Sequence, residues 1–346
     1  MANIKKSSSY WINSSDISKY LLPYLSPTTP GTKYWESQPS GELTDRQIGR
    51  ICLQVHQLVE KIEKTKGAKK ISFLDIGTGN GFIPRLIPYF KKVEFSHGCD
   101  PFLDGDHQTG FQKHNRDNEF LRILEFMKSV SNKKNVLNFN DYSRKTSNEH
   151  FYGRPLPVQL IFNDENESLF KFFQVGAHDL DNLEYSYNFL YCKAIEHIHN
   201  WPLFFEKAFE NSSNDAIFYL KHKSFFSYLG AHRYGSTGLA WGHLRMTEKE
   251  YENYVDRLFP DRSNLMKKFY FDDLAYPRNT VGEMIKIASS KGWKLGSVEY
   301  ERSKNIECFQ QILFSDEPYI YKEIKDNFDV SIDELLSGLI HITFTK

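Results

Sequence analysis

The stretch Ile71-Ser-Phe-Leu-Asp-Ile-Gly-Thr-Gly-Asn-Gly81 says more about the fold than any other part of the sequence. It begins as a short apolar run, which predicts a buried strand, and it ends in a turn with three glycines. Residues 82–90, which follow directly, have a helical pattern. A strand, a glycine-rich turn and a helix form a nucleotide-binding corner, because small residues let the backbone approach a ligand while helix N–H groups point at it. The alternative is a tight strand-to-helix turn that binds nothing.

The spacing within this stretch bears on which nucleotide would bind. A dinucleotide fingerprint reads G-x-G-x-x-G and faces a pyrophosphate, whereas residues 75–81 read D-x-G-x-G-x-G. Asp75 stands at the end of the predicted strand, where a carboxylate would repel a pyrophosphate but could hold an ammonium group, directly or through water. The pattern therefore favours a cofactor with an amino-acid tail over NAD.

Residues Leu74-Asp-Ile-Gly-Thr-Gly-Asn-Gly81 resemble the first motif of the class I S-adenosylmethionine-dependent methyltransferases of the small-molecule type. The resemblance implies a Rossmann-like α/β fold, with a seven-stranded, mostly parallel sheet, a reversed edge strand and helices on both faces. It also implies that S-adenosylmethionine is the cofactor. The residues that it implicates here are Asp75, Gly77, Thr78, Gly79 and Gly81.

A second acidic residue, Asp100, stands at the end of the next predicted strand. Residues 93–100 predict a second strand that ends at Asp100, close to the roughly 20-residue spacing of the acid that hydrogen-bonds ribose in Rossmann-type sites. In the resembled family an acid here binds the ribose of S-adenosylmethionine, so Asp100 and Pro101 are added to the cofactor residues. The alternative for Asp100 is a turn or cap residue before the proline.

The turn after the predicted third strand, residues 169–175, is a weaker match. The family has a Gly-Asp-Ala-type stretch here that meets the adenine amino group, and this chain has Gly176-Ala-His-Asp179. Because the acid is displaced, the candidates are Asp179 or the backbone of Ala177 and His178. A solvated loop is the alternative.

Residues 187–192 predict a fourth strand, beside the first at the switch point of the sheet, where ligands of open α/β sheets bind. The segment Lys193-Ala-Ile-Glu-His-Ile198 resembles the family's Leu-Glu-His stretch. The resemblance implies that this segment forms the floor of the methyl-transfer site, and Lys193, which opens it, is added to the cofactor residues. His197 is then a candidate acid/base or substrate contact, with a structural histidine as the alternative.

The fifth predicted strand, residues 216–221, is followed by a segment, 222–245, that is rich in His, Arg, Trp, Tyr and Gly. These residue types build shaped polar pockets with aromatic walls, and the segment should face the same crevice. We expect it to contact the acceptor; a glycine-linked surface loop is the alternative. The candidate bases in it are His232 and His243, and the candidate substrate contacts are Arg233, Tyr234 and Trp241.

Metal binding is not predicted. The spacings between His222, His232 and His243 match no standard zinc pattern. The four cysteines form no C-x-x-C pair, which argues against a structural zinc site or a disulfide framework.

Composition narrows the class of protein. The 346 residues include 40% hydrophobic and 15% aromatic side chains, as in a globular protein. Lys+Arg and Asp+Glu are both 44, and this balance argues against a broad nucleic-acid surface. The N-terminus lacks the apolar core of a signal peptide, and no run approaches the roughly 18 apolar residues of a membrane span. We therefore expect a cytoplasmic protein.

The organisation that we expect is an aromatic and proline-containing segment at 1–43, packed on the core or acting as a lid, followed by a methyltransferase domain at 44–346. Insertions are expected at 103–168, which includes an added strand at 158–162, and at 222–280 and 303–337. The remaining elements predicted are helices at 44–64, 115–130, 204–209, 251–258, 281–290, 317–328 and 332–336, and strands at 293–300 and 338–346.

The expected function is S-adenosylmethionine-dependent methylation of a small molecule. The Asn-Pro-Pro-Tyr signature of the N6-adenine and glutamine methyltransferases is absent after the fourth strand. Glu196 is the only acid between Tyr191 and Asn200, so the pair of glutamates that binds arginine in the protein-arginine type is not evident. A sugar, glycan precursor, lipid-like or secondary-metabolite acceptor remains, with O-methylation preferred. The alternatives are an NAD-linked oxidoreductase and a non-catalytic binding protein with the same fold.

Overall fold

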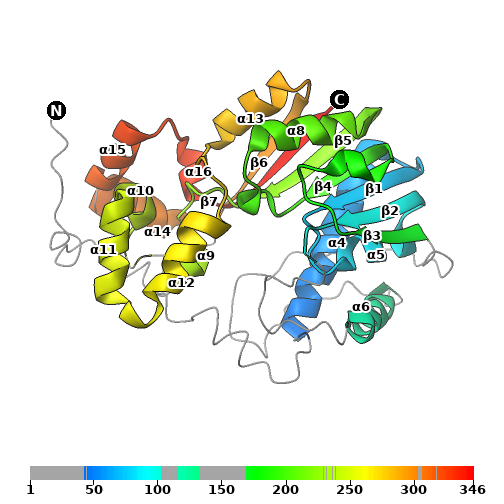
Figure 1. The fold of residues 1–346 in the computed structure, drawn as a ribbon, viewed down its shortest axis with the longest axis horizontal. Coiled ribbons are helices and arrows are strands. Elements are labelled where there is room, and N and C mark those ends of the chain that lie inside the picture. The colour runs from blue at the N-terminus through cyan, green and yellow to red at the C-terminus, as the bar shows by residue number, and fades with distance from the viewer. Residues whose placement is uncertain are drawn as a thin grey trace.

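The computed structural model (Figure 1) describes residues 43, 45–102, 116–131, 169–228, 230, 232–235, 237, 239–302, 306–316 and 318–346. The segment predicted at 1–43, apart from Leu43, lies outside the described residues, and so does the added strand predicted at 158–162.

The core of the molecule is one seven-stranded sheet with the order β3-β2-β1-β4-β5-β7-β6. The first five strands pair in parallel, and β7 pairs antiparallel with both β5 and β6. This confirms the predicted seven-stranded sheet with its reversed strand. The reversed strand lies between β5 and β6 rather than at the edge, because it has a hydrogen-bonded neighbour on each side. The strands are β1 (Ile71–Ile76), β2 (Val93–Cys99), β3 (Phe170–Phe173), β4 (Tyr187–Cys192), β5 (Ser212–His222), β6 (Lys294–Arg302) and β7 (Ser337–Thr345).

Helices cover both faces of the sheet, as predicted. On one face lie α4 (Asp45–Lys66), α5 (Phe82–Phe90) and α6 (Arg116–Ser131), and on the other lie α8 (Trp201–Glu210) and α13 (Val281–Ser290) (Figure 1). Every residue of β1 is buried. A central parallel strand covered on both faces has no solvated side, which is why apolar side chains stand at both odd and even positions, such as Phe73 and Leu74.

Local chemistry accounts for several helix boundaries. The helix predicted at 204–209 begins earlier, at Trp201, because the Asn200 side chain accepts a hydrogen bond from the Leu203 N–H and Pro202 fits the first turn. Thr247 and Thr280 each form the capping box that their spacing to a glutamate predicts. The helix at 82–90 is short, as predicted from the proline inside it.

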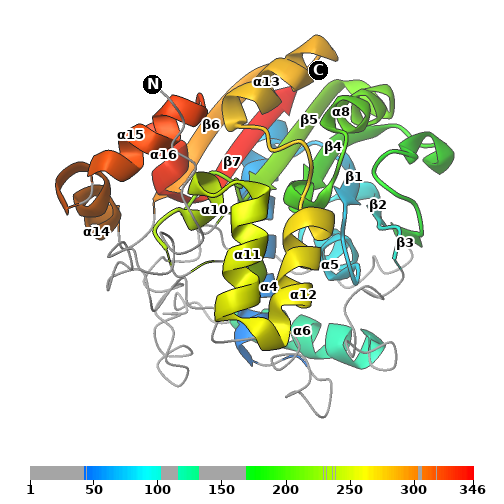
Figure 2. The same cartoon turned by 60° about the vertical axis from the view of Figure 1, so that its left-hand side comes forward.

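A group of short helices lies beyond the end of β5, on the left of Figure 1, and Figure 2 shows it from another side. It combines two stretches of chain, because buried side chains of residues 226–244 pack against those of 309–336 in one hydrophobic cluster. Its helices are α9 (His232–Gly235), α10 (Gly242–Arg245), α11 (Glu248–Leu258), η5 (Pro260–Arg262), α12 (Ser263–Lys268), η6 (Phe269–Asp273), α14 (Ile306–Gln311), η7 (Ile312–Asp316), α15 (Pro318–Asn327) and α16 (Ile332–Leu336).

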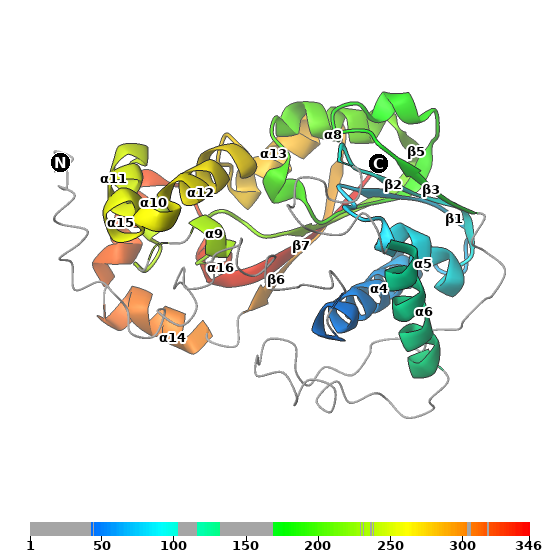
Figure 3. The same cartoon turned by 60° about the horizontal axis from the view of Figure 1, so that its bottom comes forward.

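Figure 3 shows the helices α4 and α6 together below the sheet, on the opposite side of the molecule from α13. Cys52, Cys99 and Cys192 are buried free thiols. Within the described ranges, no helix combines the length and the apolar character needed to cross a membrane.

We predict that Phe73→Ala lowers the free energy of unfolding by about 3–5 kcal/mol. Phe73 on β1 stacks on Phe189 of β4, with ring centroids 6.0 Å apart, and both rings are fully buried. Urea denaturation would measure the loss. Phe314→Ala is the control, because that side chain is 50% exposed, and it should cost less than about 1 kcal/mol. Equal losses in the two variants would contradict this account of the core.

Candidate functional site

The glycine turn after β1 has the geometry that its sequence requires. Gly77, Gly79 and Gly81 have φ angles of 71°, 63° and 74°, in the left-handed region that favours glycine. A Cβ at Gly77 would lie 2.7 Å from the Cβ of Ala194, so the turn packs directly against the segment after β4. A Cβ at Gly79 would meet no described atom within 4 Å, so the backbone is open to a ligand at this point.

The two predicted acids, Asp75 and Asp100, both lie at this turn and are both buried. Asp75 accepts a hydrogen bond of 2.7 Å from the Thr78 hydroxyl. Asp100 accepts one of 2.8 Å from the Gly79 N–H and one of 3.0 Å from the Phe102 N–H. The carboxylate after β2 therefore holds the turn that follows β1, and the two strand ends form one unit.

The pKa of Asp75 is raised to about 7, mainly by burial and to a smaller extent by Asp100, against the opposing effects of the hydrogen bond from Thr78 and the charge of Lys193. A buried carboxylate of this kind is stabilised by an ammonium group beside it. Asp75 is thus suited to a cofactor with a charged amino group, as the sequence suggested.

The residues predicted to meet adenine lie in the turn after β3. His178 Nε2 donates a hydrogen bond of 2.7 Å to the His199 carbonyl, which ties this turn to the segment after β4. Asp179 immediately precedes η3 (Leu180–Leu183). Pro101 is exposed, and its carbonyl accepts a hydrogen bond from Gln174. A role for these residues in binding adenine stays a prediction.

Two lysines face α4 from the ends of β4 and β5. Lys193 Nζ lies 3.2 Å from Gln54 Oε1, and Lys221 Nζ lies 2.5 Å from Gln57 Oε1. The pKa of Lys221 is lowered to about 7, mainly by burial and also by the charge of Lys193. Lys221 was not among the predicted site residues, although its place at the end of a predicted strand was a signal. Together the two amino groups line this side of the strand ends, opposite α4.

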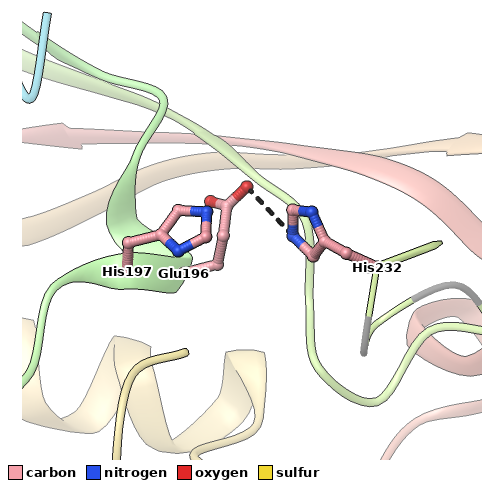
Figure 4. Close-up of side chains that lie close together, drawn as sticks. All are labelled: Glu196, His197 and His232. Atoms are coloured by element: carbon pink, nitrogen blue, oxygen red, sulfur yellow. Dashed lines mark ion pairs between the residues drawn. The ribbon is translucent and has the colours of Figure 1, made fainter. Parts of the chain in front are cut away.

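A second cluster of side chains lies on the other side of the same strand ends. Glu196 and His197 belong to η4 (Ile195–His197), which follows β4, and His232 begins α9. Glu196 Oε1 lies 3.8 Å from His232 Nε2, and the two imidazole rings are 5.3 Å apart between centroids. Figure 4 shows the two rings on either side of the Glu196 carboxylate. The structure thus brings together His197 and His232, two of the three predicted bases. It adds Glu196, which its position directly before His197 in the sequence could have indicated.

Hydrogen bonds fix the orientation of His197. Its Nδ1 lies 2.8 Å from the Asp273 carbonyl oxygen, and since a carbonyl can only accept, Nδ1 carries the proton. The lone pair of the neutral ring is therefore on Nε2. The Glu196 carbonyl accepts a hydrogen bond of 2.7 Å from the Ala275 N–H, so the segment 273–275 holds both residues of the pair.

His222, at the end of β5, was placed in the predicted loop but not among the site residues. Its ring packs edge-on against Trp201, with centroids 5.7 Å apart, and among the described residues neither ring nitrogen has a hydrogen-bond partner. His222 and Glu196 line a cavity that also borders Arg278 and has room for about one water molecule.

Two other predicted site residues, Trp241 and His243, are buried by packing within the group of short helices. Trp241 is fully buried in the cluster between α10 and α14, with its ring 6.0 Å from that of Phe309. His243 is buried as well, and its Nε2 donates a hydrogen bond of 2.8 Å to the Phe225 carbonyl. The structure places both side chains in the packed interior, away from the Glu196–His197–His232 cluster, and their contact with an acceptor stays a prediction. The backbone of Arg233 and Tyr234 lies in α9, and their contact with substrate stays a prediction.

No protein-family model matches the sequence, and the search of curated proteins finds no match. Similar solved structures include an S-adenosylmethionine-dependent methyltransferase from Mesorhizobium loti, with 11% identity, a TM-score of 0.38 and coverage of 81% of this chain and 92% of that chain. The plantazolicin methyltransferase BpumL in complex with SAH has 12% identity and a TM-score of 0.37, with coverage of 95% and 98%. The cyclopropane synthase MmaA2 from Mycobacterium tuberculosis has 12% identity and a TM-score of 0.38, with coverage of 83% and 84%.

These likenesses are distant, and the fold is assigned from the sheet itself. Five parallel strands in the order 3-2-1-4-5, completed by a reversed seventh strand between the fifth and the sixth, are the arrangement of the class I methyltransferases. The chain has the Rossmann-like fold of class I methyltransferases.

We predict that His243 makes the protein sensitive to acid. Burial lowers the pKa of His243 to about 4, so below the usual pKa of about 6.5 the unfolded chain binds a proton that the folded chain does not. This contribution to stability is complete above pH 6.5 and is lost as the pH falls toward 4, by up to about 1.4 kcal/mol per pH unit. Urea denaturation at several pH values should give a shallower dependence for His243→Gln than for the unchanged protein. Identical slopes would contradict the neutral buried state.

Proposed function

We propose that this chain is an S-adenosylmethionine-dependent methyltransferase that acts on a small molecule or on a glycan- or lipid-like acceptor, by O-methylation. The observation that carries the proposal is the glycine turn. Its backbone is held by Asp100, is open at Gly79, and packs through Gly77 against the segment that leads to Glu196 and His197. A cofactor site and an acceptor site would then share one wall.

The residues of the turn fit the proposed cofactor. Asp75 would hold the ammonium of the amino-acid tail, and the Asp100 carboxylate would accept hydrogen bonds from the ribose hydroxyls. Lys193, whose Nζ lies 3.2 Å from Gln54 Oε1, would pair with the carboxylate of the tail. When bound, S-adenosylmethionine supplies an electrophilic methyl group on its sulfonium.

The cluster after β4 supports a hydroxyl acceptor. A hydroxyl must lose its proton as it is methylated, and a neutral imidazole is the usual group to take it. His197 has the required lone pair on Nε2, because Nδ1 donates to Asp273. The Glu196 carboxylate beside it would stabilise the imidazolium that forms, and His232 borders the same space.

An NAD-linked oxidoreductase is the less favoured interpretation of the fold. A buried carboxylate at Asp75, in contact with the turn through Thr78, would lie close to a bound pyrophosphate and repel it. A non-catalytic protein with this fold would show no turnover. Release of S-adenosylhomocysteine with any acceptor would exclude that second alternative.

We predict that the unchanged protein binds S-adenosylmethionine and not NAD, and that Gly79→Arg weakens this binding at least a hundredfold by filling the open space at the turn. Isothermal titration measures both. Gly67→Arg is the matched control, because Gly67 also has a positive φ, of 57°, and also has no described atom within 4 Å of an added Cβ. It lies between α4 and β1, at the opposite end of that strand, so the same substitution should leave the affinity unchanged. The proposal fails if the unchanged protein does not bind the cofactor or if both variants bind it equally.

A further inference from the structure

The Glu196–His197–His232 cluster has a property that a proton acceptor does not need. One carboxylate oxygen and one ring nitrogen from each histidine all lie within 4.8 Å of one another. Two of the residues come from the end of β4, and the third comes from α9 beyond the end of β5. Figure 4 shows the three side chains converging on one space.

We propose that Glu196, His197 and His232 bind a divalent transition-metal cation. The sequence offered a different set of histidines, His222, His232 and His243, whose spacings match no standard zinc pattern. The structure separates that set, because His243 lies in the interior against Phe225. His197 and Glu196 take its place.

The orientation of His197 is the first support. A histidine that ligates a metal nearly always donates its other ring N–H to a carbonyl or a carboxylate, which fixes the tautomer. His197 does this through Nδ1, which donates to the Asp273 carbonyl at 2.8 Å. Its Nε2 therefore has a lone pair to offer.

The carboxylate of Glu196 is the second support. Its Oε2 is buried and has no hydrogen-bond partner among the described residues, although buried polar atoms almost always have one. A cation would satisfy this oxygen. Lys193 and Lys223 also act on Glu196 electrostatically, so their charges oppose a cation and lower its affinity.

The spacing is the third support. Glu196 Oε1 and His232 Nε2 are 3.8 Å apart, too far for a hydrogen bond. Two ligands that are each about 2.1 Å from one tetrahedral ion are about 3.4 Å apart. A small movement of either side chain would thus reach the bonded distance. His232 begins α9 with φ 54°, and a non-glycine residue in the left-handed region is held there at a cost, as often seen at functional sites.

The donor set indicates which cations fit. Two imidazoles and one carboxylate suit Zn²⁺, Mn²⁺, Fe²⁺ or Co²⁺, whereas Mg²⁺ and Ca²⁺ prefer oxygen donors alone. Three protein ligands leave a position open, as in catalytic rather than structural zinc sites. An oxygen of the acceptor would bind there and become more acidic. This role rests on the proposed function, whereas the binding of the cation does not, and a histidine bound to the cation would not also take up the proton.

We predict that the full chain, without S-adenosylmethionine, binds one equivalent of Co²⁺ or Zn²⁺. Equilibrium dialysis gives the stoichiometry, and the hyperfine-shifted imidazole N–H resonances in the NMR spectrum of the Co²⁺ form show histidine ligation. Glu196→Gln and His232→Ala should each weaken binding at least a hundredfold, because each removes one ligand. His199→Ala is the matched control. His199 binds the same neighbouring segment, through the Asp272 carbonyl at 3.1 Å, but is not one of the three ligands.

Two results would overturn the inference: no saturable binding by the unchanged protein, or an equal loss in His199→Ala and His232→Ala. If a variant fails to fold, the Co²⁺ spectrum of the unchanged protein decides, because absence of imidazole ligation would also overturn it. Titration with S-adenosylmethionine separates this inference from the proposed function. Cofactor binding without cation binding would contradict the cation site alone. Cation binding without cofactor binding would contradict the methyltransferase proposal alone.

Discussion

The contact between Gly77 and Ala194 is the constraint on which the whole crevice depends. Any side chain at residue 77 would collide with the segment after β4, since even a Cβ would come within 2.7 Å of Ala194. The glycine turn and the segment 193–198 are therefore held side by side. The hydrogen bond from the Gly79 N–H to Asp100 adds the end of β2 to the same unit. These two interactions place the proposed cofactor residues against the proposed acceptor residues.

The parallel sheet extends this arrangement to the side chains beyond β4 and β5. Because both strands end at the same edge, Lys193 and Lys221 meet α4 on one side, and Glu196 meets His232 on the other. The two sides differ in their chemistry, with amino groups on the first and imidazoles with a carboxylate on the second. The proposed cofactor site uses the first side, and the proposed acceptor and cation sites use the second.

Much of the fold was predictable because its signals are local. The strand at 187–192 and the helices at 82–90, 281–290 and 332–336 have the predicted bounds, since apolar runs, glycine turns and capping residues act within a few positions. The predicted cofactor acids, Asp75 and Asp100, also lie at the turn, because a strand that ends in an acid places it at the edge of the sheet. The resemblance to the methyltransferase family implied the reversed strand, but it placed that strand at the edge rather than between β5 and β6.

The sequence by itself determined the fold class, the glycine turn and the place of the Glu196-His197 pair at the end of a central strand. Only the tertiary structure decided which histidine of the 222–245 segment joins that pair. His232 does, while His243 and Trp241 are packed inside the group of short helices. The physical reason is that burial of a side chain depends on residues far away in the chain, here 309–336, and no local pattern of spacing encodes which face of a short helix those residues will cover.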